Sequence, residues 1–357
     1  MDHQPTRVGV IFGGRSSERE VSLASGRQVV YNLDRAAYTA VPLFMDHAGA
    51  LWRLPEKLVL QNTCADIQSR LASDAERIPF EALPAAVDVA FVALHGKYGD
   101  DGCIQGALEL LDIPYTGSGV LGCALSLDKP MAHTVMAEAG FALPREVVVS
   151  EREWSRDPDA ITARIAESIG QPLVVLPARE GSSIGVTVVA DVEDIGPALA
   201  EAFRWDDRAL VEEYLDGMEF SVIVLEKPTD ARGSHPEALL PTETVSTNPF
   251  MTYDDKYMPG RSQKITPARV PPDQLARIRA EAERLFLALG FRGYARLDGF
   301  LTADGRLLFT DPNSTSGMSP SSFMFHQAAE AGMTASHVID RILAAALHAH
   351  TTKRGPL

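Results

Sequence analysis

Cysteine is scarce in this chain, with three residues in 357. Cys64, Cys103 and Cys123 stand far apart, and none has the Cys-x-x-Cys spacing of a zinc ligand pair or a redox motif. A fold stapled by disulfides is therefore not expected, and the three side chains are expected to be reduced thiols. This cysteine usage is typical of a cytoplasmic protein, and we expect that location.

The chain also lacks an excess of positive charge and a long apolar run. Its 33 lysines and arginines face 48 aspartates and glutamates, which gives a formal net charge of −15. Such a charge argues against non-specific nucleic-acid binding. No apolar run approaches the roughly 18 residues of a membrane span, and MDHQPTRVGVIFGG enters a strand without an apolar signal segment. We expect neither a nucleic acid nor a membrane as a partner.

A dinucleotide fingerprint is missing too, although the chain begins by alternating strands and helices. Apolar runs predict strands within residues 7–14, 36–45 and 86–96, the last typical of a parallel sheet covered on both faces. A helix is predicted from about Ser17, with Ser17 and Glu20 as a capping box. This βαβ pattern predicts an α/β, Rossmann-like layer up to about residue 120. FGGRSSERE has no Gly-x-Gly-x-x-Gly, so a dehydrogenase is not expected.

The most informative stretch is GYARLDGFLTADGRLLFTDPNSTSGMSPSS, which reads as a hairpin. The Asp-Gly pair at 304–305, between two apolar runs, predicts a two-residue turn. With that turn Asp298 lies opposite Asp311, and Arg296 lies opposite Asn313. Because side chains alternate along a strand, all four share one face.

Two carboxylates in cross-strand contact repel each other, and a divalent cation bound between them would remove this repulsion. Asp298, Asp311 and Asn313 offer only oxygen ligands, which suit Mg²⁺. The alternative is a solvated outer face; Phe300 and Phe309, placed on the same face by this register, argue against it. The following loop, STSGMSPSS, offers N–H groups and hydroxyls for an oxyanion or a substrate carboxylate.

A second hairpin is predicted in PLVVLPAREGSSIGV, residues 172–186, with strands at about 173–176 and 186–189. The small residues of its turn can expose N–H groups to phosphates. The strand that leads into the turn carries no lysine, however. Two interpretations stay open: a phosphate-binding hairpin that lacks one cation, or a polar hairpin without a ligand.

Seven segments then follow one another along nearly the whole chain. They are GGRSSEREVSLASG, ALHGKYGDDGCIQGALELLDIPYTGSGVLGCALSLDK, AREGSSIGV, VEEYLDGMEFSV, YDDKYMPG, ARLDGFL and DPNSTSGM. In this order and spacing they resemble the D-alanine–D-alanine ligases of the ATP-grasp superfamily. The resemblance implies a three-domain α/β fold: an N-terminal Rossmann-like substrate domain (1–125), a central ATP-grasp subdomain (126–215) and a C-terminal one (216–350) with the Mg²⁺ and substrate sites.

The resemblance also implies a reaction and residues for it. ATP would phosphorylate one D-alanine, and the amine of a second would attack the acyl phosphate, leaving D-alanyl-D-alanine for peptidoglycan synthesis, ADP and phosphate. Glu18 would hold the first ammonium, His95 would lie beside the first carboxylate, and Ser322 and Phe323 would bind the second substrate. Lys129 and Lys256 would contact the phosphates, and Glu212, Glu213 and Glu219 the adenine and ribose. Asp298, Asp311 and Asn313 would hold two Mg²⁺ (or Mn²⁺) ions, Arg296 and the Gly317 N–H would stabilise the tetrahedral intermediate, and Glu18, Ser182 and Tyr257 would form a lid latch.

Some positions depart from the family pattern. Lysine is usual where this chain has Leu176, and glutamate is usual where it has Asp311. The usual strings NTSPGM or NTLPGM are also absent from DPNSTSGMSPSS. Asp311 keeps the ligand chemistry with one methylene fewer, whereas Leu176 removes a cation. Lys129, Lys256, the metal ions or Arg179 would then have to replace its charge.

These departures leave three hypotheses. The leading one is a cytoplasmic, homodimeric D-alanine–D-alanine ligase. The second is a related ligase of specialised metabolism or antibiotic resistance with another acceptor, such as D-lactate, D-serine or a different amino acid; Tyr257 favours an amine over a hydroxy acid. The third is a weakly active nucleotide-binding homologue.

Overall fold

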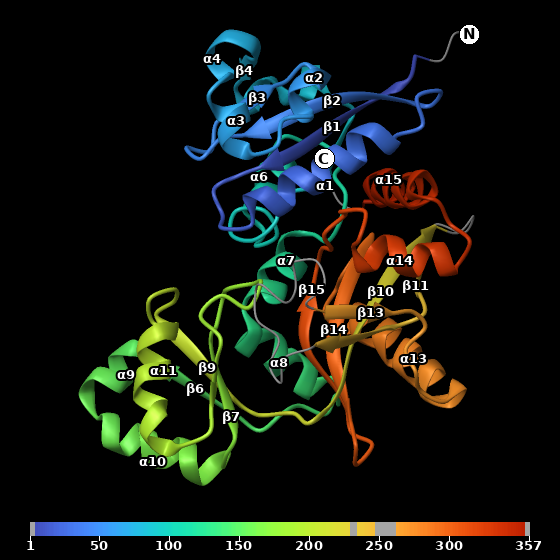
Figure 1. Cartoon of the computed structure of the whole chain (residues 1–357). Coiled ribbons are helices and arrows are strands. Elements are labelled where there is room, and N and C mark those ends of the chain that lie inside the picture. The colour runs from blue at the N-terminus through green and yellow to red at the C-terminus, as the bar shows by residue number, and fades with distance from the viewer. Residues whose placement is uncertain (1–3, 229–233, 247–261, 354–357) are drawn as a thin grey trace.

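The computed structural model describes residues 4–228, 234–246 and 262–353. They form three β-sheets that follow one another along the chain, each with its own helices (Figure 1). The predicted α/β fold class is confirmed. The predicted domain boundaries stay a prediction. No helix in the described ranges has both the length and the apolar character needed to span a membrane.

The first sheet has the strand order β4-β3-β2-β1-β5. Its parallel centre contains the three predicted strands, as β1 (Thr6–Gly13), β2 (Tyr38–Met45) and β5 (Val89–Val92). The stretch between β2 and β5 contains short elements only: β3 (Leu51–Arg53), α2 (Glu56–Val59), α3 (Cys64–Gln68), α4 (Leu71–Asp74), β4 (Glu76–Ile78), η1 (Phe80–Ala82) and α5 (Leu83–Ala86).

Helix α1 (Arg19–Asn32) begins two residues later than predicted, and the capping box of Ser17 and Glu20 is wrong. Glu18 is the N-cap residue, and its side chain makes no capping hydrogen bond. The Glu20 carboxylate instead accepts the N–H of Cys64 at 3.1 Å. Contacts with distant segments therefore replace local capping here, and Glu18 faces another part of the chain.

The central sheet has the order β6-β9-β7-β8. It comprises β6 (Glu146–Ser150), β7 (Leu173–Pro177), β8 (Thr187–Val189) and β9 (Arg208–Glu213). Strands β7 and β8 pair antiparallel, which confirms the hairpin predicted at 172–189. Helices α9 (Glu151–Arg156), α10 (Pro158–Ser168) and α11 (Ile195–Ala202) accompany the sheet, with η2 (Val192–Asp194) before α11. Apolar side chains of α10 and α11 pack on one sheet face and leave the other for the cleft.

The third sheet has the order β13-β12-β10-β14-β15, and β11 pairs with β10. Its strands are β10 (Gly217–Pro228), β11 (Ser234–Ala238), β12 (Thr242–Ser246), β13 (Ser262–Ile265), β14 (Tyr294–Thr302) and β15 (Leu307–Asn313). Helices α8 (Lys129–Glu138) and α13 (Pro272–Ala288) share one core with it. Helices α14 (Phe323–Glu330) and α15 (Ala335–Thr351) share a core with β10 and the first sheet, and so join the two ends of the chain (Figure 1). Helices α6 (Cys103–Leu110) and α7 (Val120–Leu127) connect the first sheet to α8.

The hairpin of β14 and β15 has the predicted partners near its base but a different turn. Leu301 pairs with Leu307, and the Thr302 N–H donates to the Arg306 carbonyl at 3.0 Å. Three residues, 303–305, thus form the loop, and Gly305 at its end has φ +86°, as the commonest three-residue hairpin loop requires. The predicted two-residue turn is wrong.

A β-bulge next to Gly299 offsets that extra residue. Beyond it, Asp298 pairs with Asp311 and Arg296 with Asn313, as predicted. Phe309, however, pairs with Gly299 and lies on the opposite face. There its ring centroid is 5.5 Å from that of Phe220 in the core. The prediction that Phe309 shares the face of the two carboxylates is therefore wrong.

Candidate active site

A cavity of about 460 Å³ lies where segments of all three sheets meet. Most of the predicted site residues line it: Glu18, His95, Lys129, Ser182, Glu219, Arg296, Asp298, Asp311, Asn313, Gly317, Ser322 and Phe323. Glu212 and Glu213 do not line it, and Lys256 and Tyr257 lie outside the described residues. The fold thus brings together groups that are up to three hundred residues apart in sequence.

Two cations neutralise the paired carboxylates at the base of the β14–β15 hairpin. The Arg296 Nε lies 3.0 Å from both oxygens of Asp298, and the Ser221 hydroxyl donates to the same carboxylate at 2.6 Å. On the other strand, Lys129 Nζ lies 3.3 Å from Asp311. The amide of Asn313 is 3.4 Å from Asp298. This set of oxygen donors between two cations fits a divalent ion such as Mg²⁺.

Lys129 joins this hairpin to the central sheet. It is the first residue of α8, which Asp128 caps by accepting the Met131 N–H at 3.2 Å. Its ammonium donates to the carbonyl of Glu180 at 2.7 Å, in the turn after β7. The side chain is almost fully buried. A cation held at this junction faces both the turn and Asp311, where a phosphate would meet it.

A contact between Glu18 and Ser182 closes the turn after β7 onto the first sheet. The Ser182 hydroxyl donates to the Glu18 carboxylate across 164 residues of sequence. Glycines make room for it, because a Cβ on Gly96 would lie 2.7 Å from a Glu18 oxygen. Ser182 itself has φ +51°, a conformation uncommon outside glycine. Two of the three predicted latch residues are therefore in contact.

His95 is buried and hydrogen-bonded rather than exposed. Its Nε2 lies 2.9 Å from the Ser25 hydroxyl, which also accepts the Met318 N–H at 3.0 Å. Burial, together with the nearby Arg296, lowers the pKa of His95 to about 4. The imidazole is therefore neutral near pH 7, and it can offer a hydrogen bond without adding charge.

Asp100 is a cavity residue that the sequence analysis did not single out. It accepts the Gly96 N–H and the Thr315 hydroxyl, each at 3.1 Å, and so links two loops of the cavity wall. Burial and the nearby Glu18 raise the pKa of its carboxyl group. The string GDDG close to His95 was the signal that could have indicated it.

The Gly/Ser-rich loop after β15 ends in the N-terminus of α14. Ser322 caps that helix, and its oxygen accepts the Phe325 N–H at 3.4 Å. The hydroxyl hydrogen of Ser322 stays available as a donor. Ser322 and Gly317 both line the cavity. This wall supplies the hydroxyl and backbone donors that a carboxylate or oxyanion needs.

Glu212 and Glu213 point to opposite faces of the central sheet. Glu213 accepts from Arg145 Nε at 3.1 Å and from Arg306 at 2.8 Å, so two arginines occupy its carboxylate. Glu212 lies on the cleft face beside His133, whose Nδ1 is 3.7 Å away. Burial raises the pKa of Glu212 to about 7. Of the three predicted adenine and ribose ligands, only Glu219 lines the cavity.

Leu176 lies on the same cleft face, next to Leu210 of β9, because Val175 and Val211 point into the core. It is 8% exposed, so the missing lysine is replaced by a buried apolar contact. Arg179 does not fill the gap. It is bound to Asp206 at 2.6 Å and to Asp207 at 2.6 Å, and it does not line the cavity.

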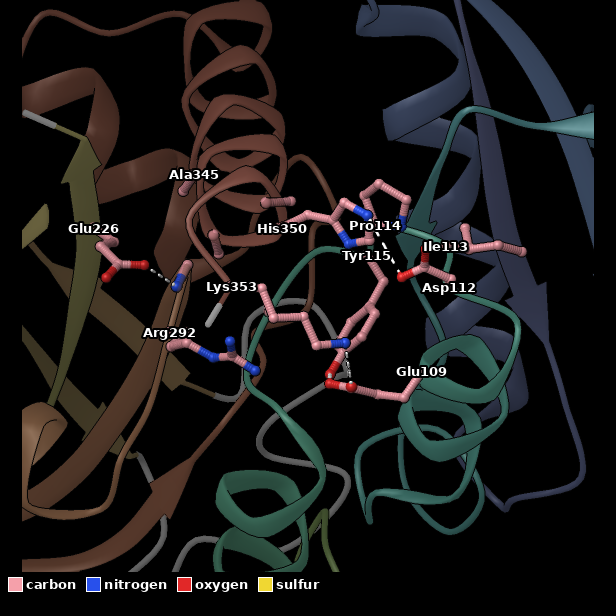
Figure 2. A pocket seen from close by; sticks show the side chains of 14 residues that line it. Glu109, Asp112, Ile113, Pro114, Tyr115, Glu226, Arg292, Ala345, His350 and Lys353 are labelled. Carbon is pink, nitrogen blue, oxygen red and sulfur yellow. Dashed lines mark hydrogen bonds and ion pairs between the residues drawn. The ribbon is translucent and has the colours of Figure 1, made fainter. Parts of the chain in front are cut away.

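A second pocket, of about 40 Å³, has room for a few waters only. Figure 2 shows the side chains that close it, from α15, α6 and the segment after α6, β10 and the segment before β14. Lys353 lies 2.9 Å from Glu109, and the Tyr115 hydroxyl donates to the same carboxylate at 2.8 Å. The ion pairs around this pocket connect the end of α15 to the segment around α6 beside the first sheet. Because the pocket is too small for a substrate, we interpret it as a structural contact between these segments.

Comparison with known proteins gives one consistent result. A family profile described as "D-ala D-ala ligase N-terminus" matches residues 7–118, and one described as "D-ala D-ala ligase C-terminus" matches residues 135–344. A protein of Geobacter sulfurreducens named D-alanine--D-alanine ligase is 36% identical, over 96% of this chain and 94% of its own. One of Geobacillus thermodenitrificans with the same name is 32% identical, over 98% and 97%.

Two solved structures are similar over nearly their whole length. The VanG D-Ala:D-Ser ligase from Enterococcus faecalis superposes with a TM-score of 0.84 at 27% identity, covering 96% of this chain and 100% of its own. The D-alanine-D-alanine ligase from Coxiella burnetii gives 0.83 at 24% identity, covering 98% and 96%.

Proposed function

This chain belongs to the D-alanine–D-alanine ligase family, and on that premise we propose that it joins two D-alanines at the described cavity at the expense of ATP. The three-domain α/β fold expected for an ATP-grasp ligase is confirmed. One observation carries the proposal. The cavity unites the Asp298–Asp311 pair, the Ser182 turn bound to Glu18, and the donor-rich loop before α14.

The residues divide the reaction between them. Glu18 and His95 would hold the first D-alanine, the glutamate by charge and the neutral imidazole by a hydrogen bond. Lys129 would bind the phosphate that ATP transfers to the carboxylate of this first D-alanine. Arg296 and the Gly317 N–H would receive the negative charge that develops when the second amine attacks the acyl phosphate, which releases phosphate and leaves the dipeptide.

Divalent ions would be held by Asp298, Asp311 and Asn313, and would neutralise the charge on the phosphates. Arg296 and Lys129 lie beside the same carboxylates, 2.9 Å from Asp298 and 3.3 Å from Asp311. Both cations would therefore lie next to the phosphoryl group that is transferred. ATP with Mg²⁺ (or Mn²⁺) is therefore the proposed cofactor set.

We also propose a cytoplasmic homodimer. On the neighbouring helices α6 and α7, Leu110 and Leu121 are 90% and 73% exposed. Exposed leucines on two helices that contact each other favour contact with another protein surface. Light scattering after size-exclusion chromatography tests this, and a monomer at assay concentration refutes it.

The main experiment is phosphate release from MgATP by the purified protein, with the product identified by mass. D-alanine is compared with D-serine, D-lactate and L-alanine, each alone and paired with D-alanine. The expected result is D-alanyl-D-alanine as the main product. ATP binding without any ligation product would refute the proposal and favour a nucleotide-binding homologue.

A further inference from the structure

One histidine and two glutamates meet between α8 and the central sheet. They are His133 on α8, Glu146 on β6 and Glu212 on β9. None of the three lines the cavity of the candidate active site. One nitrogen and two oxygens of these side chains lie within 4.8 Å of one another, a spacing at which three side chains can share one metal ion.

The two glutamates are direct neighbours across the ladder of β6 and β9. Glu146 pairs with Glu212, so the two carboxylates share one face of the central sheet. Like charges directly opposite each other destabilise a sheet. Within the described ranges neither carboxylate has a lysine or an arginine at ion-pair distance, and the cation available to both is the imidazole of His133. One imidazolium can offset the charge of only one carboxylate, so the ionised cluster stays negative.

Glu212 contributes an oxygen without a hydrogen-bond partner. Its side chain is 12% exposed, and its Oε1 atom is fully buried with no hydrogen bond to the described part of the chain. The Nδ1 atom of His133 lies 3.7 Å away, beyond hydrogen-bond distance. A buried polar atom in this position is costly unless a cation or a donor meets it. This oxygen is thus available to a ligand that enters between the three side chains.

The imidazole of His133 is oriented as a metal ligand. The side chain is fully buried, and its Nε2 lies 3.1 Å from the carbonyl of Thr310. Because a carbonyl only accepts, Nε2 carries the hydrogen, and Nδ1 faces the carboxylates at 2.6 Å from Glu146 and 3.7 Å from Glu212. Metal-binding histidines usually donate their other N–H in this way. Two ligands of a tetrahedral zinc ion lie about 3.4 Å apart, which is between these two distances.

The donor atoms select the class of ion. One imidazole nitrogen and two carboxylate oxygens suit Zn²⁺ or a similar transition cation, whereas Mg²⁺ prefers oxygen ligands alone. The predicted magnesium ligands, Asp298, Asp311 and Asn313, include no imidazole. The Glu146 side chain is 23% exposed, so a water molecule can reach the ion and complete a tetrahedral site with three protein ligands.

We propose that His133, Glu146 and Glu212 bind a divalent transition cation of the Zn²⁺ class, at a site separate from the predicted magnesium site. The bound ion joins α8 to two strands of the central sheet. Because α8 shares its core with the third sheet, the ion also restrains the central sheet against the rest of the chain. The inference goes beyond the proposed ligase function and does not depend on it, since no residue that lines the cavity takes part.

The test titrates metal-free protein with ZnCl₂ in excess Mg²⁺ by calorimetry, and with CoCl₂ by visible absorption, which distinguishes four-coordinate from six-coordinate Co²⁺. The wild type should bind a single Zn²⁺ in this way, and its Tm should rise. His133→Gln and Glu146→Gln should each weaken Zn²⁺ binding at least about tenfold, the lower bound for loss of a mere outer-shell partner. His337→Gln on α15 and Glu167→Gln on α10, both at exposed positions, are the matched controls and should bind Zn²⁺ like the wild type.

A further variant, Asp298→Asn, separates this site from the predicted magnesium site and should keep the spectrum of four-coordinate Co²⁺. Absence of Zn²⁺ binding in the wild type overturns the inference. So does a loss of binding in Asp298→Asn or His337→Gln that His133→Gln does not show. If the buried His133 cannot be replaced without unfolding, the partly exposed Glu146 decides, and wild-type Zn²⁺ affinity in Glu146→Gln overturns the inference. Dipeptide formation is measured separately, so a wild type that ligates D-alanine but binds no Zn²⁺ refutes this inference alone.

Discussion

Replacing Asp298 by Asn tests the proposed metal site while keeping the shape of the side chain. The wild-type carboxylate accepts from Arg296 at 3.0 and 2.9 Å and from Ser221 at 2.6 Å. The amide oxygen of Asn can keep the Ser221 bond, but Arg296 loses its counter-charge. With magnesium, one of the two negative ligands is also lost, so Mg²⁺-dependent ATP turnover should fall at least about a hundredfold.

The cost to stability follows from the burial of the ion pair. The Arg296 and Asp298 side chains are 22% and 14% exposed. Breaking a fully buried pair costs about 3–5 kcal/mol, and an exposed pair contributes at most about 1 kcal/mol. This half-buried pair should therefore cost about 2 kcal/mol in metal-free protein. Asp304→Asn on the same hairpin, where the carboxylate is 66% exposed, is the matched control and should cost far less.

Calorimetry with and without Mg²⁺ and ATP is the appropriate assay. Three sheets in one chain make a single two-state free energy unreliable, so the shift in Tm is compared instead. Ligand at a hundred times its Kd should stabilise the wild type by about 2.7 kcal/mol, and D298N should lose the Mg²⁺-dependent part. A variant that turns over MgATP at the wild-type rate, or gains the full stabilisation from Mg²⁺, would refute the metal assignment.

The other predictions concern three further positions. Leu176→Lys should tighten ATP binding roughly ten- to a hundredfold by restoring a charged phosphate contact; calorimetric titration with unchanged affinity would contradict this. Gly299→Ala should cost about 1–3 kcal/mol, because its Cβ would lie 2.2 Å from the Leu308 carbonyl, and an unchanged melting curve would argue against the bulge. Glu212 has a raised pKa of about 7, so the native state holds its proton while the unfolded state loses it. The wild type should therefore lose stability relative to Glu212→Gln as the pH rises from about 4.5 to 7, by at most about 3 kcal/mol. If the difference in Tm between the two proteins does not change with pH, then burial does not outweigh the opposing effect of the nearby His133 on the pKa of Glu212.

Local patterns determined the strands and the candidate metal pair. Apolar runs predicted β1, β2 and β5, since a buried strand needs little more than continuous apolar side chains. Asp298 and Asp311 could be paired because a hairpin fixes partners over a short stretch of chain. The predicted pairing was nevertheless right only because two one-residue differences from the prediction cancel. The loop at the tip is one residue longer than predicted, and the bulge at Gly299 restores the register.

The position of that bulge depends on the packing of the core, which could not be deduced from the sequence. Phe309 turns into the core against Phe220, and only a residue without a Cβ fits opposite it. The capping box at Ser17 failed for a similar reason: a distant partner, Cys64, binds the carboxylate of Glu20. A prediction from local sequence fails where a tertiary contact supplies the hydrogen-bond partner that the local motif was expected to supply.

The site residues show the same division. The motifs indicated which chemistry the chain carries, because residue type fixes what a side chain can ligate or donate. Only the tertiary structure brought Ser182 to Glu18, occupied Glu213 with two arginines, and placed Lys264 over Phe323. The contacts of Ser182 with Glu18 and of Glu213 with Arg306 join segments of different sheets. All of these contacts depend on how distant segments of the chain pack, which no local pattern encodes.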